Sequence, residues 1–343
     1  MKGVFEEDKV AAAGKLIANA GRIVISTHKS PDGDAVGSSL ALALYLKKCT
    51  AAEVFVVVPD AYPDFLSWIP GQEIVLIMDD APDRVAELIS TADVIFTLDY
   101  NSLKRCGDVG PLLENVDCEM IMIDHHQAPE SYARVTFSDV SSCSTAQMVY
   151  QFIESRGDVA LIDNEIAQGI YCGIMTDTGS FRFPSVSPYT HQIAARLIEN
   201  GLDHSAIHRA VYDTNLEDRL KLLGYALSQK LDVYQDLRTA VITLTAEELK
   251  AHHHRQGDTE GLVNYALSIK GINLAVFIRE GNNNTRMSFR SKGQFNVNEF
   301  ARAHFNGGGH NNAAGGMSEE SVEQTYERLR AILPDYRNQL DYE

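Results

Sequence analysis

The sequence predicts an α/β protein of two domains, and three observations support this prediction. At 343 residues the chain exceeds the size at which a single hydrophobic core usually stops growing. Short runs of β-branched residues alternate with segments of helical periodicity, which is typical of a largely parallel sheet. Hydrophobic residues make up 45% and charged residues 22% of the chain, as in ordinary globular proteins, so we expect it to fold throughout.

The expected architecture is a parallel-sheet N-terminal domain followed by a smaller α/β domain, with a cleft between them. We expect the first domain over residues 1–211, a helical connector over 212–235 and the second domain over 236–343. The connector is predicted from helical patterns between about 190 and 235, after which strand-like and helical runs resume at 239–244, 271–278, 286–290, 297–305 and 319–333.

The N-terminus and the cysteines indicate a cytoplasmic protein. The first residues carry acids and lack the apolar segment of a signal peptide, and the longest apolar runs are only strand-sized, so no membrane partner is expected. The five cysteines are odd in number and show no Cys-x-x-Cys pair. We therefore expect reduced, mostly buried thiols and neither a disulfide framework nor a thiolate zinc site.

The charge distribution argues against binding to long nucleic acid. The formal net charge is -17, whereas coating a long nucleic acid requires many Lys and Arg contacts to phosphates. Residues 1–214 hold 30 acids and 15 bases, a net of -15, and residues 215–343 hold 17 acids and 15 bases, a net of -2. We therefore expect residues 1–214 to bind cations, and we expect phosphates to bind more readily to residues 215–343.

Polar residues follow three predicted buried strands at their carboxyl ends. The predicted strand at 22–26 precedes His28, and the one at 94–98 precedes Asp99. The strand at 119–123 precedes Asp124, His125 and His126. Open parallel sheets bind ligands outside the carboxyl ends of their strands. These side chains are therefore expected to converge on one crevice.

The segment from His28 to Asp34 places an imidazole and two carboxylates within seven residues. Asp32 and Asp34 repel each other unless a cation lies between them. The alternative is that one of these aspartates only caps the helix expected from Ala35 to Lys48. Similar alternatives apply to Asp99, which could simply end a strand, and to Asp177, which follows a helical pattern and could form a turn.

Together these segments contain three histidines and five aspartates, of which two histidines and four or five aspartates are counted as candidate ligands. This set of hard oxygen and imidazole ligands suits Mn²⁺, or Mg²⁺ with less preference, over metals that prefer thiolates. Because the ligands exceed what one ion needs, the sequence predicts two divalent cations roughly 3.5 to 4 Å apart, an arrangement common in phosphoester hydrolysis.

The motifs H-K-S-P-D-G-D, L-D, D-H-H and T-D-T occur in an order and spacing that resemble the DHH phosphoesterase superfamily. The segment Gly307–Gly316 resembles the signature of the DHH-associated domain, so the likeness covers nearly the whole chain. Two-domain members of this size are oligoribonucleases, or nano-RNases, that also remove the 3′-phosphate of adenosine 3′,5′-bisphosphate (pAp).

The resemblance implies a role for each motif residue. His28, Asp32 and Asp99 would bind one ion, and Asp34, Asp99, His125 and Asp177 the other, with Asp99 as the bridge. His126 would hydrogen-bond the scissile phosphate or the leaving oxygen, and Asp124 would orient the neighbouring histidines.

In the C-terminal domain, the glycine-rich loop has a physical interpretation of its own. Successive amides of Gly307, Gly308 and Gly309 can form an anion-binding concavity, with His310 as an added donor, while a helix C-cap is the alternative. Arg290, beside Ser291, resembles the family's basic strand that meets the far phosphate of the substrate, and a solvated strand edge is the alternative. We expect Arg290, Ser291, Gly308, Gly309 and His310 to contact substrate.

The leading hypothesis is metal-dependent hydrolysis of very short RNA or DNA oligonucleotides and of nucleotide phosphates such as pAp. The alternatives are a phosphodiesterase for cyclic or linear dinucleotides, an inorganic pyrophosphatase, and a nucleotide-binding protein without activity. The intact ligand set argues against the last, and the modest number of C-terminal cations argues against a pyrophosphatase. A homodimer is one option for an oligomeric state that the sequence leaves open.

Overall fold

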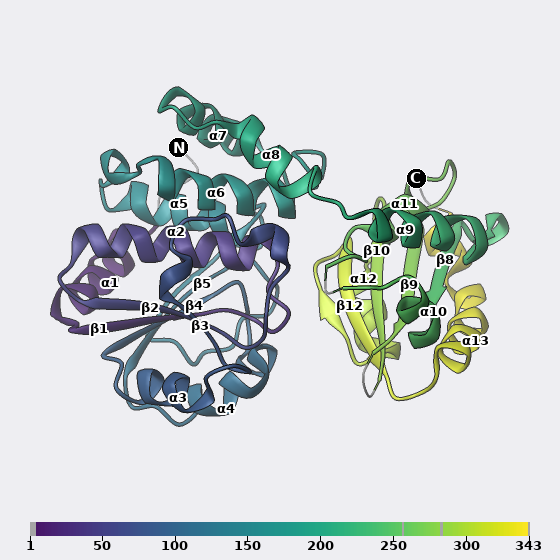
Figure 1. Ribbon diagram of the computed structural model, residues 1–343, viewed down its shortest axis with the longest axis horizontal. Helices are drawn as coiled ribbons and strands as arrows, with labels where there is room; N and C mark the ends of the chain where they lie inside the picture. Colours follow the sequence, from purple (N-terminus) through teal and green to yellow (C-terminus); the bar gives the residue numbers. More distant parts are fainter. Residues whose placement is uncertain (1–4, 256, 282–283, 342–343) are drawn as a thin grey trace. The chain divides into compact units, whose positions relative to one another are not determined.

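The computed structural model describes residues 5–255, 257–281 and 284–341. Contacts divide the chain between Thr214 and Asn215 into two compact units (Figure 1). Each unit is built on a six-stranded sheet, and the sheet of the first unit is entirely parallel. The predicted α/β class, with a parallel sheet in the N-terminal part and a second, smaller α/β part, is confirmed.

The first sheet has the strand order β3-β2-β1-β4-β5-β6. Its strands are β1 (Arg22–Ser26), β2 (Glu53–Val58), β3 (Val75–Ile77), β4 (Val94–Leu98), β5 (Glu119–Asp124) and β6 (Val135–Ser138). The chain adds strands outward from β1 to β3 and then returns to place β4 on the other side of β1. The reversal between β1 and β4 is a topological switch point, where open α/β sheets bind ligands.

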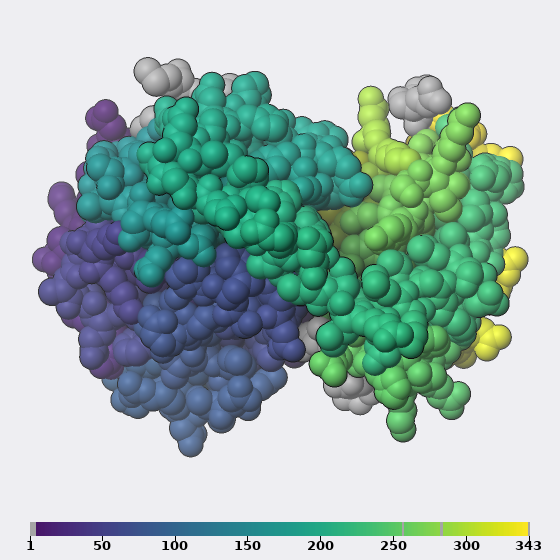
Figure 2. Space-filling view, turned by 45° about the horizontal axis from the view of Figure 1, so that its top comes forward, coloured from purple at the N-terminus to yellow at the C-terminus, as the bar shows by residue number. Residues whose placement is uncertain are grey.

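Helices cover both faces of this sheet (Figure 1). One face carries α1 (Glu7–Asn19), α2 (Gly33–Cys49), α5 (Thr145–Ser155) and α6 (Asn164–Asp177), and the other carries α3 (Pro82–Ser90) and α4 (Gly110–Leu113). Two hydrophobic clusters fill the spaces between the helices and the sheet. α7 (Pro188–Glu199) and α8 (His204–Tyr212) form an outer layer, which is visible in teal in Figure 2.

α2 and α6 approach each other closely because glycines face one another at their crossing. A Cβ atom on Gly37 would lie 2.5 Å from the carbonyl oxygen of Gly169, and one on Gly169 would lie 2.7 Å from that of Gly37. Side chains at these positions would push the helices apart. The crossing therefore sets the distance between Asp34, near the start of α2, and Asp177, the last residue of α6.

The second sheet has the order β11-β12-β10-β9-β8-β7, with β8 and β9 parallel and the other pairs antiparallel. Its strands are β7 (Leu231–Tyr234), β8 (Thr239–Leu244), β9 (Leu274–Glu280), β10 (Thr285–Ser291), β11 (Gly308–Gly309) and β12 (Ala313–Ser318). Its helices are α9 (Glu217–Gln229), α10 (Ala246–Ala251), α11 (Leu262–Leu267), α12 (Val297–His304), α13 (Val322–Ile332) and α14 (Arg337–Leu340).

Each face of the second sheet has its own hydrophobic cluster. Residues of α9, α10 and α11 pack over β8 and β9 on one face, and residues of α12 and α13 pack over β9 and β10 on the other. The segment expected to be a connector, 212–235, contains α9 and β7, and both lie in the second unit.

The five cysteines form no disulfide, and Cys106, Cys143 and Cys172 are buried. Among the described residues, no helix is both long enough and apolar enough to cross a membrane.

Candidate metal centre

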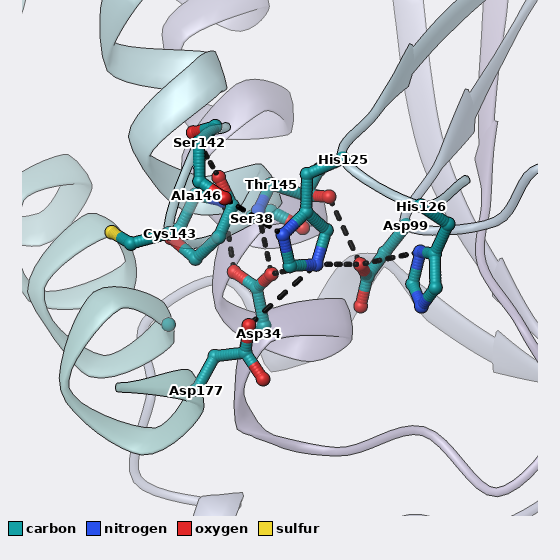
Figure 3. Close-up of polar contacts among 12 residues, drawn as sticks. Asp34, Ser38, Asp99, His125, His126, Ser142, Cys143, Thr145, Ala146 and Asp177 are labelled. Carbon is teal, nitrogen blue, oxygen red and sulfur yellow. Dashed lines mark hydrogen bonds and ion pairs between the residues drawn. The ribbon is translucent and has the colours of Figure 1, made fainter. Parts of the chain in front are cut away.

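The carboxyl ends of β1, β4 and β5 bring the predicted motif residues of the first unit together. Asp99 directly follows β4 and lies between His28 and His125. Figure 3 shows its contacts with His125 and His126. Its Oδ2 is 3.4 Å from Nε2 of His28, and its Oδ1 is 3.4 Å from Nε2 of His125. The two oxygens of one carboxylate therefore face ligand atoms from two different strand ends.

One group of candidate ligands consists of His28, Asp32 and Asp99, whose ligand atoms lie within 4.8 Å of one another. Asp32 is also the N-cap of α2, because its Oδ1 accepts from the amides of Asp34 (3.0 Å) and Ala35 (3.1 Å). Capping and participation in the cluster are therefore compatible for this aspartate.

A second group consists of Asp34, His125 and Asp177, again with ligand atoms within 4.8 Å. His125 Nε2 is 3.9 Å from Asp34 Oδ2 and 3.5 Å from Asp177 Oδ2. Asp34 and His125 are buried, whereas the Asp177 side chain is 31% exposed. The second group therefore opens toward solvent at Asp177.

Backbone carbonyls orient two of the imidazole rings. Nδ1 of His28 contacts the carbonyl oxygen of Lys29 (2.9 Å), and Nδ1 of His125 contacts that of Ser142 (3.3 Å). With metal bound, each Nδ1 would keep the proton and each Nε2 would offer its lone pair on the carboxylate side, as a metal ligand requires.

The start of α5 contributes groups that the sequence did not reveal. The amides of Thr145 and Ala146 donate to the two oxygens of Asp34 at 2.6 and 2.8 Å, and the Thr145 hydroxyl donates to Asp99 Oδ1 at 2.9 Å (Figure 3). A helix N-terminus stabilises negative charge. Ser144 and Thr145, which precede an apolar helical segment, are a sequence signal for this helix N-terminus. The position of the N-terminus beside Asp34 follows only from the tertiary fold.

The electrostatics of the cluster are strongly perturbed. Burial and the nearby charges of Asp99 and Asp177 raise the pKa of Asp34 well above its usual range. Burial also acts to raise the pKa of Asp99, but hydrogen bonds from His125 and His28 hold it well below its usual range. Like charges are therefore crowded at Asp34 and Asp177, and a divalent cation between them would remove the repulsion.

Asp124 and His126 form a pair beside Asp99. His126 Nδ1 is 2.7 Å from Asp124 Oδ1, and the buried Asp124 Oδ2 has no hydrogen-bond partner among the residues that the structure describes. Burial and Asp99 raise the pKa of Asp124 to about 6, and burial and the charge of Arg105 hold the pKa of His126 well below its usual range. The pair is therefore desolvated and titrates differently from exposed Asp and His.

Asp99 has a backbone conformation that few side chains adopt, with φ of 66°. Aspartate tolerates this left-handed region better than most residues, and outliers of this kind often occur at functional sites. The fit of the cluster to divalent cations is good, because its oxygens and imidazole nitrogens match the ligand preferences of Mn²⁺ and Mg²⁺.

The structure places the five predicted substrate-binding residues of the second unit around β10, β11 and β12. Arg290 lies on β10, and its Nη1 donates to its neighbour's carbonyl oxygen, Phe289 O (2.9 Å). Ser291 is buried, and its hydroxyl donates to Phe295 O (2.7 Å) and accepts from Asn312 (2.9 Å). Ser291 therefore supports the turn after β10.

The glycine loop differs from the expected concavity of three successive amides. The amide of Gly307 donates to Ala301 O (3.2 Å), and that of Gly309 donates to Asn298 Oδ1 (2.9 Å). Gly308 and Gly309 form β11, which pairs with β12. The fold therefore already uses the amide donors of Gly307 and Gly309. Contact of the glycine loop with an anion stays a prediction.

Close backbone packing explains the glycine at position 309. A Cβ there would lie 2.5 Å from the carbonyl oxygen of Ala313. His310 follows β11, and its amide donates to the same carbonyl oxygen at 2.7 Å. The loop thus holds His310 at the end of the second sheet.

The fold and the cluster define a DHH-type protein. Residues 22–174 match the DHH family, N-terminal domain, and residues 240–337 match the DHHA1 domain. A relative is 32% identical over 92% of this chain and 90% of its own length. The chain therefore belongs to the DHH family and is a hydrolytic enzyme.

That relative is the bifunctional oligoribonuclease and PAP phosphatase NrnA of Thermus thermophilus. Among solved structures, an exopolyphosphatase-related protein from Bacteroides fragilis is 39% identical, with a TM-score of 0.93 and full coverage of both chains. The cyclic-di-AMP phosphodiesterase GdpP of Geobacillus thermodenitrificans is 25% identical over 95% of this chain but only 49% of its own length.

Proposed function

We propose that this protein hydrolyses very short oligoribonucleotides to mononucleotides and removes the 3′-phosphate from pAp, with two divalent cations, most suitably Mn²⁺. The observation that carries the proposal is the position of Asp99, whose two oxygens face His28 and His125 separately. A carboxylate placed in this way suits a bridge between two ions. The similarity to the T. thermophilus relative over 92% of this chain and 90% of the relative also supports this proposal.

His28, Asp32 and Asp99 would hold one ion, and Asp34, Asp99, His125 and Asp177 the other. When bound, such a pair of ions activates a water molecule and neutralises charge on the phosphoryl group. The protein supplies the fixed geometry. The amides at the start of α5 hold Asp34, the Thr145 hydroxyl holds Asp99, and the carbonyls of Lys29 and Ser142 hold the two histidine rings.

His126 would exchange a proton with the leaving oxygen of the substrate. Its Nδ1 is held by Asp124, so Nε2 is the nitrogen suited to act on substrate. The contact with the Asp124 carboxylate fixes the ring. Asp124 would therefore act as a positioning residue, and His126 would contact the substrate.

Arg290 and His310 of the second unit would bind a phosphate of the substrate other than the one being cleaved. A guanidinium donates to phosphate in a fixed fork geometry, and an imidazole adds a further donor. Ser291, Gly308 and Gly309 would act mainly by holding these two side chains in position.

A single substrate panel tests the proposal. The purified protein is assayed with Mn²⁺ against pAp, a 5′-phosphorylated dinucleotide, five-nucleotide RNA, cyclic di-AMP and pyrophosphate. We expect turnover of pAp and of the short RNAs, and little turnover of pyrophosphate. Turnover of pyrophosphate alone, or of none of these substrates with metal bound, would refute the proposal.

A second candidate function is hydrolysis of cyclic dinucleotides or of their linear products. The match to the cyclic-di-AMP phosphodiesterase covers 95% of this chain and favours it. The same panel decides between the two, because the second candidate predicts that cyclic di-AMP is the best substrate.

A further inference from the structure

One face of the second sheet carries a row of polar residues along β10. Side chains alternate between the faces of a strand. Met287 and Phe289 point into the hydrophobic cluster shared with α12 and α13, so Arg286, Ser288 and Arg290 point to the opposite face. The β10 row is defined by these three residues, and Arg286 is its most exposed member.

A second arginine stands beside the β10 row. Arg279 on β9 is directly opposite Arg286 in the antiparallel pairing of the two strands. Like charges in this arrangement destabilise a sheet. Arg279 is half-buried, and burial and the charge of Arg286 lower its pKa.

Nothing on the described part of the chain offsets this repulsion. Within residues 5–255, 257–281 and 284–341, no carboxylate lies within ion-pair distance of either guanidinium. Two adjacent cations without an acidic partner are costly to hold, and an anion bound between them removes the cost.

The surface on the β12 side of this pair is exposed. On the other side of β10, Arg286 pairs with Met317 and Ser288 pairs with Gly315. Met317 is 43% exposed, and a Cβ on Gly315 would meet only the carbonyl oxygen of Met287, at 3.9 Å. An extended ligand could therefore lie along β10, with an apolar Met side chain beside the cations.

The spacing along β10 suggests which anion would fit. Arg286 and Arg290 are four residues apart on one face, a separation of about 13 Å at the usual rise of a strand. The two phosphates of one nucleotide cannot span that distance. A strand of several nucleotides can, because its backbone presents a phosphate at every step.

We propose that Arg279 and Arg286 form an anion-binding pair for a backbone phosphate of single-stranded oligonucleotides of three or more nucleotides. The inference rests on the proposed function, because it takes Arg290 as the site of another substrate phosphate. The pair thereby determines which substrate lengths are bound well, and pAp does not reach it.

The test compares substrates of different length with Arg286→Ala, Arg286→Glu and Arg286→Lys. For five-nucleotide RNA we expect kcat/KM to fall roughly ten-fold or more in Arg286→Ala, further in Arg286→Glu, and less in Arg286→Lys. For pAp it should stay within about two-fold of the unchanged protein. The slope of log kcat/KM against log salt for the pentamer should become shallower by about 0.7 in Arg286→Ala, as expected for one lost phosphate contact to a single strand.

Arg330→Ala is the matched control, because Arg330 lies on α13 on the opposite face of the sheet. Arg330→Ala should leave kcat/KM unchanged for both the pentamer and pAp. An equal loss on pAp and the pentamer, or no loss on either in Arg286→Glu, would overturn the proposal.

Binding of a fluorescent pentamer to the full chain without divalent metal separates this proposal from the proposed function. Weaker binding in Arg286→Glu than in Arg330→Ala supports the anion-binding pair even if the unchanged protein hydrolyses no RNA. Equal binding of the pentamer by both variants would count against an oligonucleotide as the ligand of Arg279 and Arg286. An acidic protein would then be the other ligand to test at this pair.

Discussion

Asp99 shows how much of the site depends on a single residue. Its backbone is left-handed, its two oxygens face two histidines, and the Thr145 hydroxyl donates to it. A shorter side chain at this position would leave two imidazole nitrogens and a hydroxyl without their shared partner. Substitutions here should therefore affect both candidate ion positions together.

We expect Asp99→Ala to abolish hydrolysis of every substrate in the panel. Because Asp99 is proposed to hold both ions, its loss would disturb both, and metal content measured on the purified variant should fall with activity. Asp80→Ala, an exposed aspartate of the same unit, serves as control and should retain both. Near-normal turnover by Asp99→Ala with unchanged metal content would contradict the dinuclear assignment.

Arg290→Ala and His310→Ala should separate substrate binding from metal binding. Each would remove a proposed contact with a substrate phosphate. Because such contacts contribute about 1.5 to 3 kcal/mol, kcat/KM on pAp should fall roughly ten- to two-hundred-fold. Metal content should stay normal, because both residues lie in the second unit. Hydrolysis of bis-p-nitrophenyl phosphate, which has no second phosphate, is the reference reaction, and an equal loss on it would show that these residues serve the fold or the chemical step.

At the scale of elements, the site depends on how closely helices pack. α2 carries Asp34, α6 carries Asp177, and the two helices meet through Gly37 and Gly169. Packing at this crossing and the geometry of the ligands are therefore coupled. The start of α5 adds a third element, because its amides hold Asp34.

Gly37→Ala should destabilise the protein by roughly 1 to 3 kcal/mol, because the added methyl group meets a backbone carbonyl and overpacks the crossing. Urea unfolding would measure this, and Mn²⁺ affinity should weaken in parallel. Gly224→Ala in α9 is the control, since nothing lies within 4 Å of its added Cβ. That variant should be more stable by about 0.5 to 1 kcal/mol, and an equal effect of both changes would show that the crossing is not tightly packed.

The first turn of α10 should make stability depend on pH. Burial acts to raise the pKa of Glu248, but the Thr245 amide, Lys230 and Tyr225 lower it from 4.5 to about 2. A carboxyl whose pKa is lowered by folding stabilises the protein above its unfolded pKa, and this contribution is lost as the pH falls toward 2. The Glu248 side chain is 21% exposed, so we place the contribution at roughly 2 kcal/mol.

Glu248→Gln should therefore lower the free energy of unfolding at pH 7, and its difference from the unchanged protein should shrink as the pH is lowered from 5 toward 3. Glu247→Gln, an exposed neighbour in the same turn, should behave like the unchanged protein throughout. A difference for Glu248→Gln that stays constant with pH would mean that its charge contributes nothing.

At the scale of the whole molecule, the two units have separate cores. The buried clusters of the first unit end at Val211, and those of the second begin at Leu222. All the candidate metal ligands assigned above lie in the first unit. Binding of metal should therefore stabilise one unit directly.

Chelation should lower the unfolding temperature of the first unit and abolish activity, and Mn²⁺ should restore both best. Bound metal at about a hundred times its Kd stabilises by roughly 2.7 kcal/mol. Trp68 is the single tryptophan and lies in the first unit, so its fluorescence reports the unfolding of that unit. Recovery of activity with Zn²⁺ alone, or an unfolding temperature that metal leaves unchanged, would argue against this site.

Much of the first unit could be predicted from local patterns along the chain. The strands at 22–26 and 94–98 match β1 and β4, and the strand at 119–123 gains only Asp124 in β5. These were predictable because buried parallel strands read as continuous apolar runs, and their carboxyl ends must share one edge of the sheet. The convergence of His28, Asp99 and His125 followed from the same argument.

Other features of the site depend on how distant segments pack against one another. The donors of Thr145 and Ala146 to the aspartates, and the use of the Gly307 and Gly309 amides within the fold, depend on contacts between segments far apart in the chain or on backbone geometry. The opposition of Arg279 and Arg286 depends on strand register. Local propensity and periodicity specify which element a residue joins, but packing and register specify what it meets, and these are set by the folded chain as a whole.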